Sequence, residues 1–105
     1  MRKYRLSEQT RQYCYEEEHG KQSVTLRQIV ALIDFADVKA GSEGGWVDEE
    51  CALSQQGECW IYDVNSVVFA GARIRDDARL TGFCVVSHEA TMYSLLAYQP
   101  SRADQ

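Results

Sequence analysis

Several features that define large protein classes are scarce in this sequence of 105 residues: it has one proline, and no apolar run approaches the roughly 20 residues of a membrane-spanning helix. The first ten residues lack the apolar stretch of a signal peptide. Acidic residues (16) outnumber basic ones (11), so the formal net charge is −5, and no basic half or tail is available to contact phosphates. These absences exclude a membrane protein and an ordinary DNA-binding protein. We expect a cytoplasmic protein with no direct contact to nucleic acid or membrane.

Metal-binding and disulfide signatures are absent as well. The four cysteines are too far apart for a zinc-type Cys-x-x-Cys pair, and neither His19 nor His88 lies at ligand spacing from them. In a reducing cytosol such thiols stay reduced, and we expect the cysteines to pack as small, semi-buried apolar side chains. We therefore predict no metal site, no cofactor and no disulfide framework; the cysteines are Cys14, Cys51, Cys59 and Cys84.

The composition that remains, 45% hydrophobic and 26% charged, is typical of one small globular domain. Changes in composition divide this single domain, residues 1–105, into three parts. An N-terminal β cap subdomain is expected at 1–45 and β-helix repeats at 46–92. A C-terminal cap or tail is expected at 93–105.

The cap is predicted to be a small β unit. Strands are expected at 3–6, 12–17 and 23–34, with a polar hairpin tip at His19-Gly20. A helix over 26–38 is the alternative, because the apolar residues there also follow helical spacing. We favour strand, followed by a short helical turn at 35–38, before the glycines at 41–45 end the cap.

The second half follows a six-residue rhythm. Its aliphatic residues are spaced 6, 7, 6, 6 and 6 apart, and most are followed four residues later by a small one. Short strands separated by corners, three to a coil, predict an all-β fold (minor α) with a left-handed parallel β-helix of about two coils. The inward aliphatics are Ile61, Val67, Ile74, Leu80, Val86 and Met92, and the corner residues are Asn65, Gly71, Ala78, Cys84 and Ala90.

The single spacing of seven predicts one inserted residue, placed as a bulge at 68–70. Coils would then stack with Trp60 beside Arg79 and Arg75 beside Tyr93 on the outside, in position for cation–π contacts. Residues 95–98 would close the open coil edge, or a second chain would pair with it. The predicted inward pairs are Ile61 with Leu80, Val67 with Val86, and Ile74 with Met92.

Three segments resemble the YdcK-like proteins of enteric bacteria: IDFADVKAG at 33–41, GGWVD at 44–48 and LSQQGECWIYD at 53–63. The leading KYRLSE is similar to the start of that family, so the resemblance covers most of residues 3–90. It implies an N-terminal β cap followed by a long left-handed β-helix of hexapeptide-type repeats, and no established reaction. This sequence stops where the family continues, which leads us to expect a truncated or mobile-element version.

The leading functional hypothesis is a non-catalytic module that docks onto a protein partner, because Trp and Tyr are favoured at binding hot spots. We predict no catalytic residues and no enzyme activity, and self-association as a homodimer is a further expectation. The expected contact residues are Trp46, Trp60, Tyr62, Phe83, Tyr93, Arg75 and Arg79.

Two alternatives remain open. A phage or mobile-element inhibitor of a host defence or nucleic-acid enzyme would present carboxylates in place of phosphates, using residues 16–18 and 48–50. A hexapeptide-type acyltransferase would need a histidine as general base, since the imidazole titrates near neutral pH. Only His88 lies within the repeats; His19 belongs to the hairpin tip.

Overall fold

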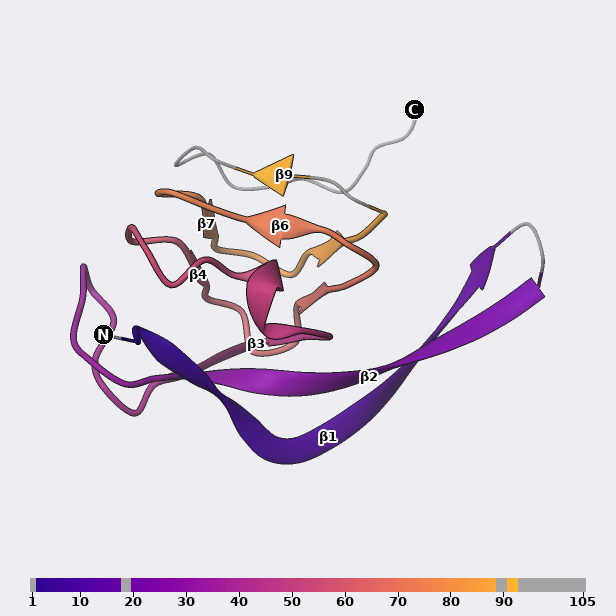
Figure 1. Ribbon diagram of the computed structural model, residues 1–105, viewed down its shortest axis with the longest axis horizontal. Helices are drawn as coiled ribbons and strands as arrows, with labels where there is room; N and C mark the ends of the chain where they lie inside the picture. The colour runs from indigo at the N-terminus through magenta and orange to yellow at the C-terminus, as the bar shows by residue number, and fades with distance from the viewer. Residues whose placement is uncertain (1, 18–19, 89–90, 93–105) are drawn as a thin grey trace.

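The chain folds into β-strands stacked over a long, twisted hairpin (Figure 1). This computed structural model describes residues 2–17, 20–88 and 91–92, the last two by their backbone. Within those ranges there is no α-helix, so the all-β prediction is confirmed, and the expected minor α content is a single 3-10 turn, η1 (Glu50–Ala52). The strands are β1 (Tyr4–Glu17), β2 (Gly20–Ala31), β3 (Glu43–Val47), β4 (Trp60–Ile61), β5 (Val67–Val68), β6 (Arg73–Ile74), β7 (Arg79–Leu80), β8 (Val85–Val86) and β9 (Thr91–Met92).

The hairpin of β1 and β2 is longer than the sequence predicted. Antiparallel pairing runs from Glu17↔Gly20 to Tyr4↔Ala31, with an irregularity between Leu6 and Thr10. The two separate strands expected at 3–6 and 12–17 are therefore one strand, because the irregularity absorbs the polar residues between them without ending the pairing.

The expected helical turn at 35–38 is wrong. Phe35 and Val38 exchange both backbone hydrogen bonds, at 2.9 and 2.7 Å, as an isolated antiparallel bridge. Ala36 lies between them at φ 47°, a left-handed conformation that a right-handed helical turn does not contain. The segment is a tight two-residue turn.

Parallel pairs of short strands build the rest of the fold. The five-stranded sheet is mixed, with order β1-β2-β3-β5-β8, and its last three strands are parallel. Two further parallel pairs, β4-β7 and β6-β9, lie beside it, and a parallel bridge joins Leu53 to Ile74. Figure 1 shows successive passes of the chain rising from β3 through β6 to β9, above the hairpin. We refer to these three parallel stacks as the three ladders.

The predicted inward pairs are correct for two of the three ladders. Ile61 lies beside Leu80, and Ile74 lies beside Met92. In the third ladder Val68, not Val67, pairs with Val86. Both Val68 and Val86 are fully buried in the core between the ladders.

The inserted residue lies earlier than the predicted bulge at 68–70. The corner after Ile61 is one residue longer than the others and is closed by the Ser66 amide donating to the carbonyl of Asp63 at 3.1 Å. The buried corner residue is therefore Ser66 and not the predicted Asn65. At the next corner it is Ala72 and not the predicted Gly71. A small residue two positions before each inward aliphatic is the pattern that the structure follows: Cys59, Ser66, Ala72, Ala78 and Cys84 are all buried.

Left-handed backbone conformations mark matching corners in successive passes of the chain. Gly57 (φ 75°) accompanies Asp76 (φ 57°), 19 residues later, and Ala70 (φ 56°) accompanies His88 (φ 60°), 18 residues later. Positive φ is uncommon outside glycine, and histidine and aspartate tolerate it better than most residues. The repetition shows that each pass of the chain turns in the same way.

Two apolar clusters hold the ladders and the hairpin together. The larger fills the space between the ladders. The smaller joins Val67 and Phe69 to Leu26 of the hairpin. No helix in the described part of the chain is long and apolar enough to cross a membrane.

Candidate functional site

His88 lies at a corner just after β8 and contacts the far end of the hairpin. Its Nε2 atom lies 2.7 Å from Oε2 of Glu17, the last residue of β1, and its Nδ1 atom lies 2.7 Å from the hydroxyl of Ser87. The His88 side chain is 56% exposed and that of Glu17 is 33% exposed. The imidazole is therefore held by two polar partners and still open to a ligand.

An aromatic cluster fixes the distance between the hairpin and this corner. The Tyr15 ring lies 4.7 Å from the ring of Phe69, and Tyr13 lies 5.2 Å from it. The His88 ring meets Tyr15 and Phe69 edge-on at 6.1 and 6.2 Å. Packing of the hairpin on the ladder thus brings the carboxylate of Glu17 to an imidazole 71 residues away in sequence.

The hydrogen bonds define which nitrogen can act as a base. An ionised carboxylate only accepts, so the neutral imidazole donates its Nε2–H to Glu17. The lone pair then lies on Nδ1 and faces Ser87, whose hydroxyl donates to it. A carboxylate behind an imidazole also stabilises the imidazolium that forms when Nδ1 takes a proton. This arrangement can remove a proton from an incoming hydroxyl or amine.

His88 was a candidate base from the sequence, whereas its partners Glu17 and Ser87 were not predicted. Glu17 appeared only as part of an acidic run at the hairpin tip. Tyr13 and Tyr15 could have indicated the position of Glu17. Residues two apart on a strand share a face, so residue 17 lies on the same face as these two tyrosines.

The described residues that were predicted to bind a partner differ in burial. Trp60 has the predicted outward register beside Arg79, but it is only 2% exposed, because Tyr4 and Phe35 cover its ring edge-on at 6.4 and 5.4 Å. Trp46 is half-buried, with its indole N–H donating to the carbonyl of Val64 at 2.9 Å. Arg11 lies over the Trp46 ring at 5.5 Å.

The other predicted contact residues come from different ladders. Tyr62 is half-buried and donates to Asp37 at 2.7 Å, and Phe83 is 58% exposed. Arg79 is beside Trp60 as predicted and lies 3.7 Å from a carboxylate oxygen of Glu58. The remaining two are Arg75, which is exposed and directly follows β6, and Tyr93, which lies outside the described residues.

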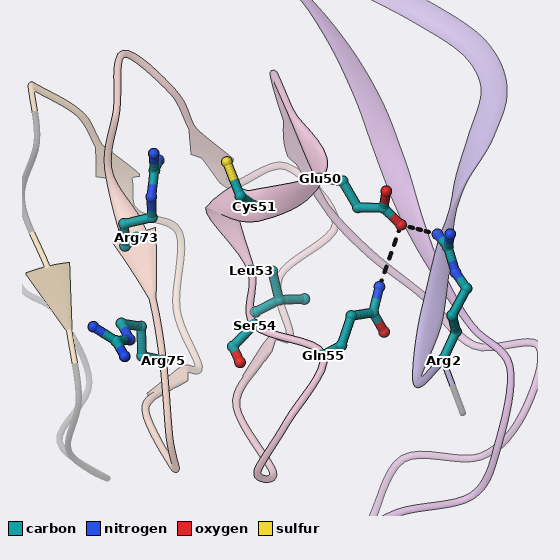
Figure 2. Close-up of a pocket in the computed structure, with 8 residues that line it drawn as sticks. All are labelled: Arg2, Glu50, Cys51, Leu53, Ser54, Gln55, Arg73 and Arg75. Carbon is teal, nitrogen blue, oxygen red and sulfur yellow. Dashed lines mark hydrogen bonds and ion pairs between the residues drawn. The ribbon is translucent and has the colours of Figure 1, made fainter.

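A second feature is an open concavity of about 630 Å³ beside η1. Figure 2 shows Arg73 and Arg75 on one side of it and Arg2 and Glu50 on the other. An ion pair joins Arg2 to Glu50. The lining residues are Arg2, Glu50, Cys51, Leu53, Ser54, Gln55, Arg73 and Arg75.

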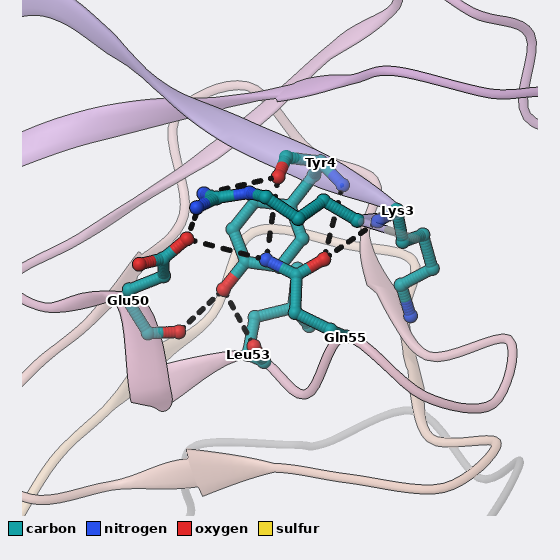
Figure 3. Close-up of polar contacts among 6 residues, drawn as sticks. Lys3, Tyr4, Glu50, Leu53 and Gln55 are labelled. Carbon is teal, nitrogen blue, oxygen red and sulfur yellow. Dashed lines mark hydrogen bonds and ion pairs between the residues drawn. The ribbon is translucent and has the colours of Figure 1, made fainter.

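Hydrogen bonds from the start of the chain make one wall of this concavity rigid (Figure 3). The side-chain oxygen of Gln55 accepts the backbone N–H groups of Lys3 and Tyr4 at 2.7 and 3.2 Å. The Tyr4 hydroxyl contacts the carbonyls of Glu50 and Leu53. Burial is the main reason that the pKa of Tyr4 is raised far above its ordinary value, so the phenol stays protonated.

The described residues contain no group of three or more His, Cys, Asp or Glu side chains placed to hold a metal ion. Two of the cysteines, Cys51 and Cys84, are also poor metal ligands because their thiols stay protonated. Burial and the neighbouring Glu49 raise the pKa of the Cys51 thiol, and burial raises that of Cys84.

Comparison with known proteins gives one strong relationship, although no family model matches the chain. The uncharacterized acetyltransferase YdcK of Escherichia coli (strain K12) is 54% identical over 86 residues, which are 82% of this chain. The same segment is 26% of YdcK, so the chain spans about a quarter of the length of this relative.

This relationship corrects the predicted function. We expected a non-catalytic docking module without enzyme activity, and the name of this relative as an acetyltransferase contradicts both expectations. The acyltransferase alternative, which depended on His88, is the one that the relationship favours. The other expectation was right: as the segments at 33–63 predicted, the chain is a YdcK-like protein.

Proposed function

We propose that this chain takes part in acetyl transfer and that His88 is its general base. The relationship to an acetyltransferase supports the reaction class. The observation that carries the assignment of His88 is its pair of 2.7 Å contacts, to Glu17 through Nε2 and to Ser87 through Nδ1.

We also propose that the three ladders are coils of a left-handed β-helix of the hexapeptide type, with residues 1–45 as its cap. Parallel stacking at intervals of 18 and 19 residues supports the coils, together with the repeated positive-φ corners and the buried small residue two positions before each inward aliphatic. Repeat folds of this kind grow by stacking further coils on the existing ones. Homodimer formation stays a prediction.

The proposed step transfers an acetyl group from a thioester, such as acetyl-coenzyme A, to a hydroxyl or amine. The acceptor takes the position at Nδ1 that the Ser87 hydroxyl marks. As the acceptor attacks the thioester carbonyl, its proton passes to Nδ1, the new C–O or C–N bond forms and the C–S bond breaks. The departing thiolate takes up the proton from the imidazolium, which restores neutral His88.

Glu17 supports this step in two ways. It fixes the ring so that Nδ1 faces the acceptor, and its negative charge stabilises the transient imidazolium. Both effects act through Nε2, at the 2.7 Å contact.

The test is thiol release from acetyl-coenzyme A, measured with a panel of amines and alcohols as acceptors. His88→Asn keeps a residue that tolerates positive φ but removes the base. It should lower kcat/KM by about 100-fold, the usual contribution of a general base. His19→Gln is the matched control and should change nothing.

Ser87→Ala separates this mechanism from one in which Ser87 itself carries the acetyl group. Activity within threefold of the unchanged chain supports direct transfer, because the acceptor replaces Ser87 at Nδ1. Loss of activity in Ser87→Ala, or full activity in His88→Asn, would contradict the assignment of His88 as the base for direct transfer.

A further inference from the structure

We propose that the concavity beside η1 binds a phosphate group, and that Arg73 and Arg75 are its principal ligands. This proposal does not depend on the acetyl-transfer site, since it uses none of the residues around His88. The concavity concentrates positive charge: three of its eight lining residues are arginines, on a chain whose net charge is −5.

The strand geometry places the two ligands on one face. Arg73 and Arg75 flank Ile74, which is fully buried and bridged to Leu53 in the preceding pass of the chain. Residues on either side of an inward residue point outward together. Figure 2 shows both guanidinium groups on the same side of the concavity, opposite the Arg2–Glu50 pair.

Ser54 adds a hydrogen-bond donor next to these arginines. Its backbone N–H donates to the carbonyl of Ile74 at 2.9 Å, which fixes its place beside β6. Its hydroxyl oxygen accepts the N–H of Gln56 at 3.0 Å. The hydroxyl proton therefore remains to donate into the concavity.

The thiol of Cys51 does not oppose an anion. Burial and Glu49 raise its pKa, so it is neutral at pH 7 and adds no negative charge. Glu50 is turned toward Arg2 and Gln55, at the opposite wall. A phosphate on the β6 side thus meets guanidinium groups, a hydroxyl and a neutral thiol, a set that suits an oxyanion.

Glu49 competes with a bound phosphate for Arg73. One of its carboxylate oxygens lies 3.7 Å from the guanidinium of Arg73, and both side chains are partly exposed. An exposed pair of this length is weak. A phosphate, with more charge and two arginines to contact, should displace it.

The experiment is a titration of the full chain with inorganic phosphate at constant ionic strength, followed by amide NMR shifts. Saturable shifts are expected at residues 54, 73 and 75. Arg73→Gln with Arg75→Gln should weaken binding by about tenfold, since charge-assisted contacts dominate such sites. Arg79→Gln is the matched control: it removes an arginine of similar exposure whose carboxylate partner also lies at 3.7 Å, on a different ladder.

A second pair of variants tests the competition. Glu49→Gln frees Arg73 and should tighten phosphate binding two- to threefold, whereas Glu58→Gln makes the same charge change beside Arg79 and should leave it unchanged. Equal effects of the two members of either pair, or shifts that never saturate, would overturn the proposal.

A parallel titration with glucose 6-phosphate tests whether the site prefers free phosphate or a phosphate group on an organic molecule. Tighter binding than inorganic phosphate, lost in the double arginine variant, indicates a phosphate carried by an organic ligand. Equal binding indicates free phosphate. His88→Asn should alter neither titration, so failure at this site and failure of the proposed acetyl transfer are distinguishable.

Discussion

Lys3 and Cys59, 56 residues apart, are joined inside the protein. The Lys3 ammonium donates to the backbone carbonyl of Cys59 at 2.8 Å and to that of Gly57 at 3.2 Å, and lies 3.4 Å from the Cys59 sulfur. It is also 5.0 Å from the centre of the Phe35 ring. Lys3 is only 3% exposed, so this contact fastens the start of β1 to the corner before β4.

Replacing Lys3 by methionine keeps the aliphatic stem and removes the donors. The buried carbonyl of Cys59 then loses its charged partner, which should lower the free energy of unfolding by about 2 kcal/mol. Urea denaturation measures the change. Lys39→Met, at an exposed lysine, is the control and should stay within about 0.5 kcal/mol. Equal stability of the two variants would show that Lys3 contributes no net stabilisation.

Sequence reasoning was most successful where side chains repeat. Small and aliphatic residues recur every six positions from 59 to 86, with one spacing of seven, and a repeated local pattern needs no knowledge of distant contacts. The pattern located the parallel pairs, but it could not decide which residue of the seven-residue spacing was extra. Val67 and Val68 are equally apolar, so only the corner closed by Asp63 and Ser66 distinguishes them.

Contacts between the hairpin and the ladders were less predictable. Trp60 follows the alternation of an outward residue and is nevertheless buried, because Tyr4 and Phe35 come from far along the chain to cover it. The partnership of Glu17 and His88 has the same origin. Both depend on how far the hairpin reaches, which the local pattern does not contain.

Glu17→Gln is the sharpest test of the orienting carboxylate. The amide keeps the size of the side chain but removes the charge that stabilises protonated His88, so acetyl transfer should fall by about tenfold. Glu16→Gln, one residue earlier and facing the other side of β1, is the matched control and should retain activity. Thiol release from acetyl-coenzyme A is the measurement. A similar loss in both variants would point to general charge instead of this hydrogen bond.

Gly45 allows β3 to approach the neighbouring ladder closely. A Cβ atom there would collide with the Ile61 side chain and lie 2.9 Å from the carbonyl oxygen of Ser66. Gly45→Ala should therefore destabilise the fold by about 2 kcal/mol through overpacking. Gly82→Ala meets nothing within 4 Å and should change stability by no more than about 0.5 kcal/mol. Thermal unfolding of the two variants side by side checks this; a stable Gly45→Ala would mean that the ladders can separate at little cost.

Tyr62 provides a test at alkaline pH. Burial, together with its hydrogen bond to Asp37, raises its pKa from the ordinary 10.0 to about 12. Because the folded pKa lies above the unfolded one, the stabilisation from this phenol is complete below pH 10 and is lost as the pH rises toward 12. In Asp37→Asn the neutral amide no longer favours the protonated phenol, so the pKa of Tyr62 should fall. Titration of ¹³C-labelled tyrosine, with Tyr62→Phe to assign the signal, measures the shift.

The control for this titration is Glu43→Gln, which removes a carboxylate from an exposed position on β3. The pKa of Tyr62 should not move in that variant, since Glu43 is not among the groups that shift it. A fall in Asp37→Asn alone would establish that the 2.7 Å bond forms in solution and ties the turn at 35–38 to the end of β4. An unchanged pKa in Asp37→Asn would leave burial and the nearby Glu58 as its causes and would contradict a persistent bond between the two side chains.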